Sequence, residues 1–458
     1  MAARHGATGL GAQLAEEMRA FSQLACQSDY ADLFAERRRE KLLEYTDGRI
    51  IHQAVAFDEG IGVRWLSEGR CRSGHVAGLT PASVRAAMAA AAGTEEGLVR
   101  SPADETAPKM AADWQTHALE GVSAAWTEVR RASDRVRRFS LEVREVHQQV
   151  WMVQRGGPIV ADRRRYSIAL VTVTASFAGR THVLTHTEAV PAPLSGLLRR
   201  LAAIAADVAG GAAAMCATTA RPEPTLPAVF SGSAAGFLIH EVCGHPLEGD
   251  LTARGVGPFA GQAGKRVASP LLTIDDLPRD PRGVGSGHWD DEGLPTRPVR
   301  LVDRGVFVQP LWDQVGSRWA GAEPTGSARR QSWQHIPLTR ASTTVVSPGD
   351  GGTTDNLLVR LDNGLWVKRA NSGLLDPVTG QFQLRAGEVY AVRHGRAAEP
   401  LGGLLLGGDA ADILASIRAV GSDQAVTTQL CGKGDQVVPV SVVTPSLLLA
   451  RVEVKGWS

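Results

Sequence analysis

The sequence is poor in cysteine and in aromatic residues, and it has no excess of either charge. Its five cysteines among 458 residues are an odd number without a CxxC pair, which excludes a disulfide framework and a four-cysteine zinc site. Lys plus Arg (49) nearly balance Asp plus Glu (48), so neither a constitutive nucleic-acid binder nor a polybasic membrane-surface protein is expected. Aromatic residues make up 5% and hydrophobic residues 43%, a composition typical of a loop-rich globular protein.

The sequence also lacks a long apolar segment. Its first residues include no apolar stretch of the kind found in signal peptides. The longest apolar run, 201–216, is rich in Ala and Gly, carries Asp207 and is short for a bilayer. We therefore expect a cytoplasmic protein with reduced thiols that binds neither membranes nor nucleic acid.

Hydrophobic periodicity predicts an α+β fold in two parts. Residues 1–217 are expected to form an N-terminal mixed α/β domain with an antiparallel sheet, because alternating apolar and polar residues follow helical segments. The arginines at 163–165 separate two such strand patterns and are interpreted as a hairpin turn. Helices are predicted over 9–26, 80–92, 123–138 and 194–216, and strands within 31–79 and 140–176.

Three prolines divide the chain. Pro222, Pro224 and Pro227 predict that residues 218–228 form a linker without regular structure. Residues 229–458 consist mostly of short apolar runs separated by glycine, which predicts a β-rich C-terminal domain. Helices are expected near 234–244 and 409–420.

The first of these helices carries two histidines and a glutamate within six residues. His240, Glu241 and His245 form a pattern typical of a metal site with an adjacent general base. Histidines five residues apart lie about 140° apart around a regular α-helix, so they could not bind one ion from it. Either the helix ends near Gly244, leaving His245 before Pro246 free to turn back, or a π-bulge forms locally.

Two histidines leave a tetrahedral catalytic site one ligand short. Candidates for the third ligand are Cys243, Glu248, Asp250, or a distant histidine or cysteine. Cys431 is the strongest distant candidate, because it lies in a polar, glycine-rich segment that we interpret as a loop between apolar strands. The remaining cysteines, at 26, 71, 216 and 243, are predicted to pack as small apolar residues.

With these residues, the chain resembles the TldD/PmbA (TldD/TldE) family of metallopeptidases, and within this family the metal-bearing TldD subunit. The resemblance is weaker in the first domain, where it includes 58–64 and the strands after 139. In the second domain it is carried by residues 240–250, 290–293, 324–333, 380–382 and 431–440.

The resemblance implies a zinc-dependent peptidase or amidase. In such an enzyme Zn²⁺ would be held by His240, His245 and Cys431, and Glu241 would be the catalytic base. Family members enclose an internal chamber as a heterodimer with a metal-free subunit and cleave unfolded or short peptides. A TldE/PmbA-like partner or a second copy of this chain is therefore expected.

Two segments depart from the family pattern. Residues 370–376 and 441–445 carry side chains where the family usually has glycines. Since glycine lets backbone approach closely, we hypothesise that these changes narrow substrate choice, towards a peptide-like biosynthetic intermediate.

Other interpretations remain open from the sequence. Cys431 could be a nucleophile with a histidine base, or the chain could be an inactive scaffold or peptide-binding subunit. There are two interpretations of the acidic stretch Asp290, Asp291 and Glu292. These residues either form a second layer of acids behind the metal site or a solvated turn, and the turn is favoured. The pair Arg329-Arg330 either grips a substrate carboxylate or lies on the surface.

Overall fold

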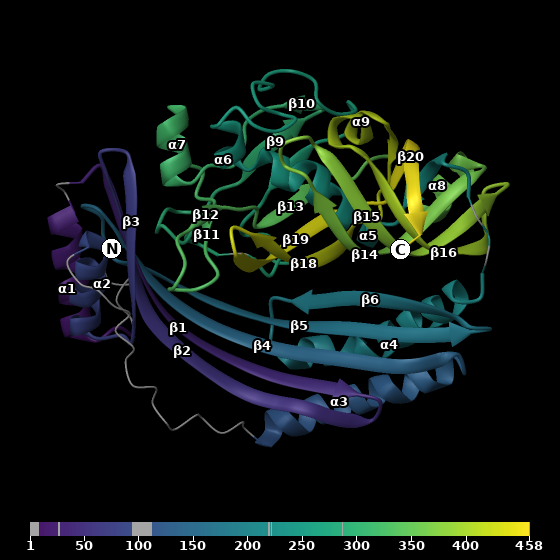
Figure 1. The fold of residues 1–458 in the computed structure, drawn as a ribbon, viewed down its shortest axis with the longest axis horizontal. Helices are drawn as coiled ribbons and strands as arrows, with labels where there is room; N and C mark the ends of the chain where they lie inside the picture. The colour runs from purple at the N-terminus through teal and green to yellow at the C-terminus, as the bar shows by residue number, and fades with distance from the viewer. Residues whose placement is uncertain are drawn as a thin grey trace.

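The computed structural model describes residues 9–25, 28–93, 112–218, 220, 222–285 and 287–457, so Cys26 lies outside the described residues. The fold is α+β: a long curved N-terminal sheet lies beneath a β-rich C-terminal region, and four helices cover the far face of the sheet (Figure 1). No helix in the described part of the chain is long and apolar enough to cross a membrane.

The N-terminal sheet is antiparallel throughout, as the alternation predicts. Its strand order is β3-β2-β1-β4-β5-β6. Asp47 and Gly48 join the first two strands with φ values of 47° and 89°, the positive angles of a tight hairpin turn. The strands are β1 (Tyr30–Thr46), β2 (Arg49–Ser67), β3 (Arg70–Ala77), β4 (Val136–Gln154), β5 (Val160–Phe177) and β6 (Arg180–Val190).

Helices cover the outer face of this sheet in two separate pairs. At one end α1 (Ala12–Leu24) and α2 (Pro81–Ala92) pack on an apolar patch of the sheet. At the other end α3 (Ala112–Ala132) and α4 (Leu194–Met215) pack on a second one. Since neighbouring strand residues point to opposite faces, the same strands supply these outer apolar patches and the inner face towards the C-terminal region.

Two sequence predictions in this part are wrong. The helix expected over 123–138 ends at Ala132, because Ser133 accepts a hydrogen bond from the Arg135 N–H and β4 begins three residues later. The arginines at 163–165 form no hairpin turn: they lie inside β5, paired with residues 147–149 of β4. Hydrogen bonding along the whole strand pair keeps this charged stretch extended.

Five strands of the C-terminal region close into a barrel. The order β16-β15-β14-β7-β20 is closed by pairing between β16 and β20, and β17 (Ile417–Val420) adds at the edge of β20. β7 begins inside the segment 218–228 that we expected to lack regular structure. The barrel strands are β7 (Thr225–Phe230), β14 (Gly364–Leu375), β15 (Gln381–Arg393), β16 (Arg396–Asp409) and β20 (Leu447–Trp457).

A second C-terminal sheet has the order β10-β9-β8-β13-β19-β18. Cys431 lies within β18, not in the loop that its glycine-rich surroundings predicted, because residues 425–433 pair with β19 along their whole length. The strands are β8 (Ile274–Asp276), β9 (Val299–Asp303), β10 (Val306–Phe307), β13 (Thr343–Val346), β18 (Ala425–Lys433) and β19 (Gln436–Thr444), with β11 (Ala328–Arg329) and β12 (Leu338–Thr339) paired apart.

The helices of this region are short. The helix expected over 409–420 ends at Ala415, since residues 417–420 pair with β20 as β17. The others are α5 (Gly232–Ile239), α6 (Gly249–Thr252), α7 (Gln314–Ala320) and α8 (Thr354–Leu361), besides α9 (Ala410–Ala415).

Buried charges join the N-terminal sheet to the C-terminal region. Arg64 of β2 pairs with Asp32 of β1 at 2.6 Å and with Glu292, while Arg330 pairs with Asp32 at 2.8 Å. We call Asp32, Arg64, Arg164, Asp291, Glu292 and Arg330 the interface cluster.

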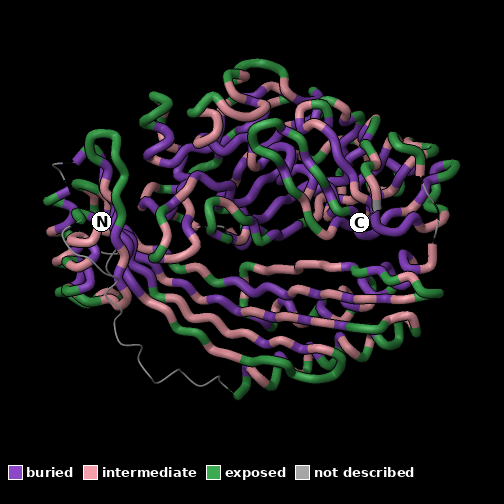
Figure 2. Tube along the Cα trace, viewed as in Figure 1, coloured by how far each residue is buried: buried purple, intermediate pink, exposed green. Residues whose placement is uncertain are grey.

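The acids of the interface cluster do not form the solvated turn that we favoured. Asp291 is 1% exposed and Glu292 0%, and Asp291 accepts an ion pair from Arg164 at 2.7 Å. Figure 2 shows buried residues running along the strands and through the C-terminal region, with exposed ones at the turns.

Candidate metal centre

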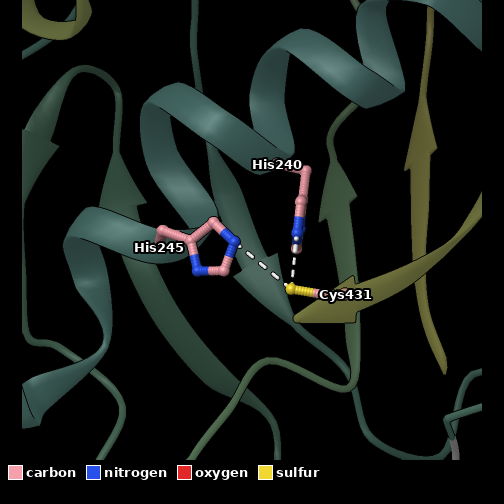
Figure 3. Close-up of side chains that lie close together, drawn as sticks. All are labelled: His240, His245 and Cys431. Carbon is pink, nitrogen blue, oxygen red and sulfur yellow. Dashed lines mark hydrogen bonds between the residues drawn. The ribbon is translucent and has the colours of Figure 1, made fainter. Parts of the chain in front are cut away.

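The two histidines lie on a helix that changes type between them. Regular α-helix ends at Ile239, residues 240–244 form a π-turn, and His245 begins a short 3₁₀ turn. The His245 N–H donates to the carbonyl of His240, a hydrogen bond spanning five residues. Residues five apart are thereby stacked one turn apart. Of the two geometries that the spacing allows, the structure has the π-turn, and both imidazoles face one point (Figure 3).

Cys431 completes this group from the other end of the chain. Its Sγ lies 3.1 Å from His240 Nε2 and 3.2 Å from His245 Nε2. The three ligand atoms lie within 4.8 Å of one another. Both Cys431 and His240 are buried. The site therefore presents one sulfur and two nitrogens converging on a shared position.

The remaining cysteines stay apart from this group. Cys243 packs in the core of the C-terminal region, where burial raises the pKa of its thiol to about 12. Cys216 is also buried, as predicted, whereas Cys71 is exposed. Cys71 lies in β3, which is an edge strand of the N-terminal sheet in the described part of the chain.

The environment keeps the Cys431 thiol ionised. Burial alone would raise its pKa, but hydrogen bonds from His240 and His245 lower the pKa to about 5. Burial alone would lower the pKa of His245, but the charge of Glu248 and the contact with Cys431 raise it to about 10. A thiolate is the form of cysteine that binds metal.

A set of charged residues stands behind the histidines and the cysteine. Glu248 Oε2 lies 3.3 Å from His245 Nδ1 and accepts from Lys433 Nζ at 2.7 Å. Lys433 also reaches Asp250 at 2.8 Å. Arg340 donates to the backbone carbonyl of Cys431 at 2.6 Å and lies 3.7 Å from Glu248. We call Glu248, Asp250, Arg340 and Lys433 the support cluster.

The support cluster was largely missed by sequence reasoning. Glu248 and Asp250 were considered as metal ligands, whereas the structure places them around Lys433. Lys433 carried a usable signal, because it lies two residues from Cys431 and so on the same face of the strand. Arg340 has no such signal, since only the fold brings it to the site.

Glu241 lies beside the histidines against the backbone of β14. The side chain is 5% exposed, and a Cβ added at Gly373 would lie 2.7 Å from Glu241 Oε1. Burial raises the pKa of Glu241, and the charges of His240 and His245 partly offset this effect. A carboxyl with a raised pKa is suited to accept and return a proton near neutral pH.

These groups open into a cavity of about 730 Å³ between the barrel, β18 and the N-terminal sheet. Leu170, Thr185 and Thr187 of the N-terminal sheet contribute to its wall, together with residues 371–375 of β14. Asn371 of β14 is hydrogen-bonded to β6 of the N-terminal sheet. It donates to the Val183 carbonyl and accepts from the Thr185 N–H, both at 3.1 Å.

The departures from the family pattern differ in position. Residues 371–375 line the cavity, whereas 441–445 are buried in β19 and its following turn. Arg329 and Arg330 do not line it: Arg330 is buried in the interface cluster, and Arg329 donates to the carbonyls of Ala341 and Pro439.

The donor set fits zinc. A thiolate and two imidazoles are the ligands that this ion prefers, and three protein ligands leave a fourth position open, as in catalytic sites. Glu248 behind His245 Nδ1 supplies the second-layer carboxylate that often orients a ligating histidine.

Comparison with known proteins finds metalloproteases among the relatives of this chain. The chain is 27% identical over 454 residues to the metalloprotease TldD homolog of Haemophilus influenzae, covering 93% of each chain. It is 28% identical over 232 residues to the zinc metalloprotease TldD homolog of Saccharolobus solfataricus, covering 50% of this chain and 52% of that one.

The fold is similar to that of TldE from Thermococcus kodakarensis, with a TM-score of 0.77, 17% identity, and coverage of 96% of this chain and 100% of that one. The family model for the PmbA/TldA metallopeptidase C-terminal domain matches residues 223–456, which include all three metal-ligand candidates and Glu241. The chain therefore belongs to the PmbA/TldA (TldD/PmbA) family of metallopeptidases.

Proposed function

We propose that the chain is a zinc-dependent peptidase or amidase of the cytoplasm, with Zn²⁺ held by His240, His245 and Cys431. The observation that carries the proposal is the convergence of one Sγ and two Nε2 atoms within 4.8 Å, next to the buried carboxyl of Glu241. A reducing compartment would keep Cys431 available as a thiolate.

In this proposal, zinc supplies an activated water and polarises the carbonyl that is attacked. Glu241 takes the proton of the attacking water on its carboxylate and returns it to the nitrogen of the departing amine. The raised pKa of Glu241 favours the first transfer, because a carboxylate with a higher proton affinity is a stronger base. Glu248 holds the His245 ring in place, and Arg340 holds the backbone of Cys431.

The cavity favours a peptide-like substrate without tertiary structure. Its wall is formed by strand segments of the N-terminal sheet, β14 and β18, and an extended peptide has the backbone geometry to lie along such strands. Residues 371–375 form part of this wall, and we propose that the side chains among them select among peptides or peptide-like biosynthetic intermediates.

We further propose that the chain acts in a two-subunit chamber. The partner is a TldE/PmbA-like subunit or a second copy of this chain. The support is membership of a family whose solved structures include a TldE with the same fold. Co-purification from the native host followed by mass spectrometry identifies the partner; a monomeric, fully active chain would contradict the chamber.

A second candidate function uses Cys431 as a nucleophile. The lowered pKa of its thiol and the two adjacent imidazoles favour this chemistry as well as metal binding. In a thiol mechanism zinc would inhibit and Glu241 would be dispensable. In a scaffold subunit without activity, neither residue would matter for hydrolysis.

Metal analysis and hydrolysis of an unfolded peptide, measured on the same preparations, separate these functions. We expect about one zinc per chain in the wild type, no zinc in Cys431→Ala, and zinc without activity in Glu241→Gln. Glu188→Gln is the matched control, because this glutamate lies in β6 of the N-terminal sheet and should leave both readouts unchanged. Full activity of Glu241→Gln, or activity after zinc is removed, would contradict the metal mechanism.

A further inference from the structure

The arginines at 163–165, which we first interpreted as a turn, belong to a basic surface on the outer face of the N-terminal sheet. Strand pairing places Arg39, His147 and Arg165 side by side on β1, β4 and β5. The next outward-facing row holds Arg37, Gln149 and Arg163 in the same order. We call these six residues the outer basic grid.

The grid lies between the two helix pairs. In β4, Trp151 on one side of it packs in the core with α1 and α2, and Val143 on the other side packs in the core with α3 and α4. The outer face is therefore apolar where helices cover it and basic in the gap between them, as Figure 1 shows for the spacing of the helices. Arg38 lies between Arg37 and Arg39 in β1, so its side chain points to the inner face of the sheet, towards the C-terminal region.

The gap is hollow. A cavity of about 390 Å³ lies over the grid, bordered also by Phe57 of β2, which is paired with Arg39 and 49% exposed. This volume is in the range of small-molecule sites. The four arginines stand at the corners of a rectangle of about 10 by 7 Å at their Cα atoms, two strand spacings wide and two residues long.

Cations outnumber carboxylates around this cavity. Glu59 pairs with Arg37 at 2.9 Å, and Glu145 pairs with Arg165 at 3.3 Å and His147 at 2.8 Å. Glu145 is also shared with Lys41 of the next row and with the first amide of α4.

Two guanidinium groups remain without an acidic partner. Among the residues that the structure describes, neither Arg39 nor Arg163 has a carboxylate oxygen within 4.0 Å, and Arg39 Nε is buried without a hydrogen-bond partner. They stand at opposite corners of the grid, so one compact anion with charges on both sides would satisfy both.

We infer that the outer basic grid binds a small polyphosphate, either free or as the phosphate chain of a nucleotide. Guanidinium forks match phosphate oxygens in geometry and charge. A phosphate chain concentrates several charges within the span of the grid, whereas a single carboxylate satisfies one fork. The helix pairs close both ends of the gap, which favours a short ligand over a polymer. Phe57 offers an exposed ring on which a base could stack.

The site is distinct from the proposed metal centre, because it lies on the opposite face of the sheet. Sodium tripolyphosphate and ATP, each titrated calorimetrically into the full-length, zinc-loaded protein, provide the two probes. We expect both to bind, with affinity falling as salt is raised. Arg39→Gln/Arg163→Gln should lose about tenfold or more in affinity, the value of one or two charge-assisted hydrogen bonds.

Arg396→Gln/Arg418→Gln is the matched control, because it removes two exposed arginines from strands of the C-terminal region. It should bind both probes like the wild type. Equal weakening in both double variants, or no binding by the wild type at physiological salt, would overturn the inference.

Comparing the two probes identifies whether the site recognises a free polyphosphate or a nucleotide. Equal binding of both probes supports recognition of the phosphate chain alone, whereas tighter binding of ATP that Phe57→Ala removes supports a nucleotide. Since phosphates also bind zinc, binding that disappears in Cys431→Ala would place the ligand at the metal centre and overturn the inference. Binding of a long single-stranded DNA but of neither small probe would do the same.

Discussion

The support cluster and the interface cluster are both buried and charged, but their balance differs. Around the metal centre, Lys433, Arg340 and His245 surround Glu248. Burial would raise the pKa of Glu248, yet the charge of Lys433 above all holds it well below its usual range. The interface cluster itself holds three arginines and three carboxylates, but around Glu292 acids predominate, because Asp32, Asp290 and Asp313 act on it together with Arg64. Burial above all raises the pKa values of Glu292 and its neighbour Asp290.

This difference suggests a division of labour. An excess of cations keeps anionic groups ionised, which is what a thiolate ligand and an orienting carboxylate require. An excess of carboxylates makes each cation indispensable to several partners at once, as Arg64 is to Asp32 and Glu292. We therefore expect the first cluster to govern metal binding and the second to govern stability.

The largest expected effect on stability comes from removing Arg64. Arg64→Met leaves Glu292 buried without its ion-pair partner, and a broken buried pair typically costs about 3–5 kcal/mol. Urea unfolding followed by tryptophan fluorescence measures the loss, and zinc content per folded chain should not change. Arg37→Met is the control on β1: its pair with Glu59 is partly exposed and should contribute about 0–1 kcal/mol. Similar losses in both variants would contradict the special role of the interface cluster.

Glu248→Gln tests whether the support cluster governs metal binding. The variant loses the carboxylate that orients His245, and zinc affinity should fall by about 10–100-fold, the usual effect of removing a second-layer partner. Competition with a chelator of known affinity measures this change. Asp250→Asn removes a charge from the same lysine without touching a histidine, so its effect should be much smaller. Equal losses would mean that net charge, and not orientation, matters.

Two buried cysteines, Cys431 of the metal centre and Cys243 of the apolar core, should differ in reactivity. In zinc-free protein, alkylation of Cys431 should rise around pH 5, because the imidazoles keep its thiolate stable down to that pH. Cys243 should stay unreacted across the neutral range, since burial raises its pKa to about 12. Mass spectrometry of the alkylated peptides reports both sites in one sample. Added zinc should protect Cys431, and equal labelling of both thiols would contradict the proposed environment.

The local part of the metal centre could be predicted from the sequence. His240, Glu241 and His245 lie within six residues, so their spacing alone indicated either a helix end or a π-turn. Cys431 lies 191 residues from His240. The resemblance, and not periodicity, assigned it as a ligand, and its glycine-rich surroundings wrongly suggested a loop.

The residues that failed prediction depend on contacts outside their own segment. The arginines at 163–165 have the composition of a turn, and only their pairing with β4 keeps them extended. The acids at 290–292 have the composition of a surface loop, and only the arginines of the N-terminal sheet and the neighbouring loop make their burial possible. Partners outside the local segment thus decided both cases.

The smallest expected effect is on how the free energy of unfolding depends on pH, and its sign should differ between Glu241 and Glu248. Because burial raises the pKa of Glu241, the folded protein binds its proton more tightly than the unfolded chain does. Stability of the zinc-free protein should therefore fall as pH rises from about 4 through the folded pKa. Glu241→Gln lacks this loss and should be more stable than wild type by about 1 kcal/mol at neutral pH. Glu248→Gln should show the opposite sign, because the pKa of Glu248 is lowered: less stable at neutral pH, with a gap that closes as acid protonates the wild-type carboxylate. Urea unfolding of the wild type and both variants between about pH 2 and pH 8 measures the two slopes, that of Glu241 above about pH 4 and that of Glu248 below it. Slopes of the same sign would remove the distinction between a carboxylate held by burial and one held by cations.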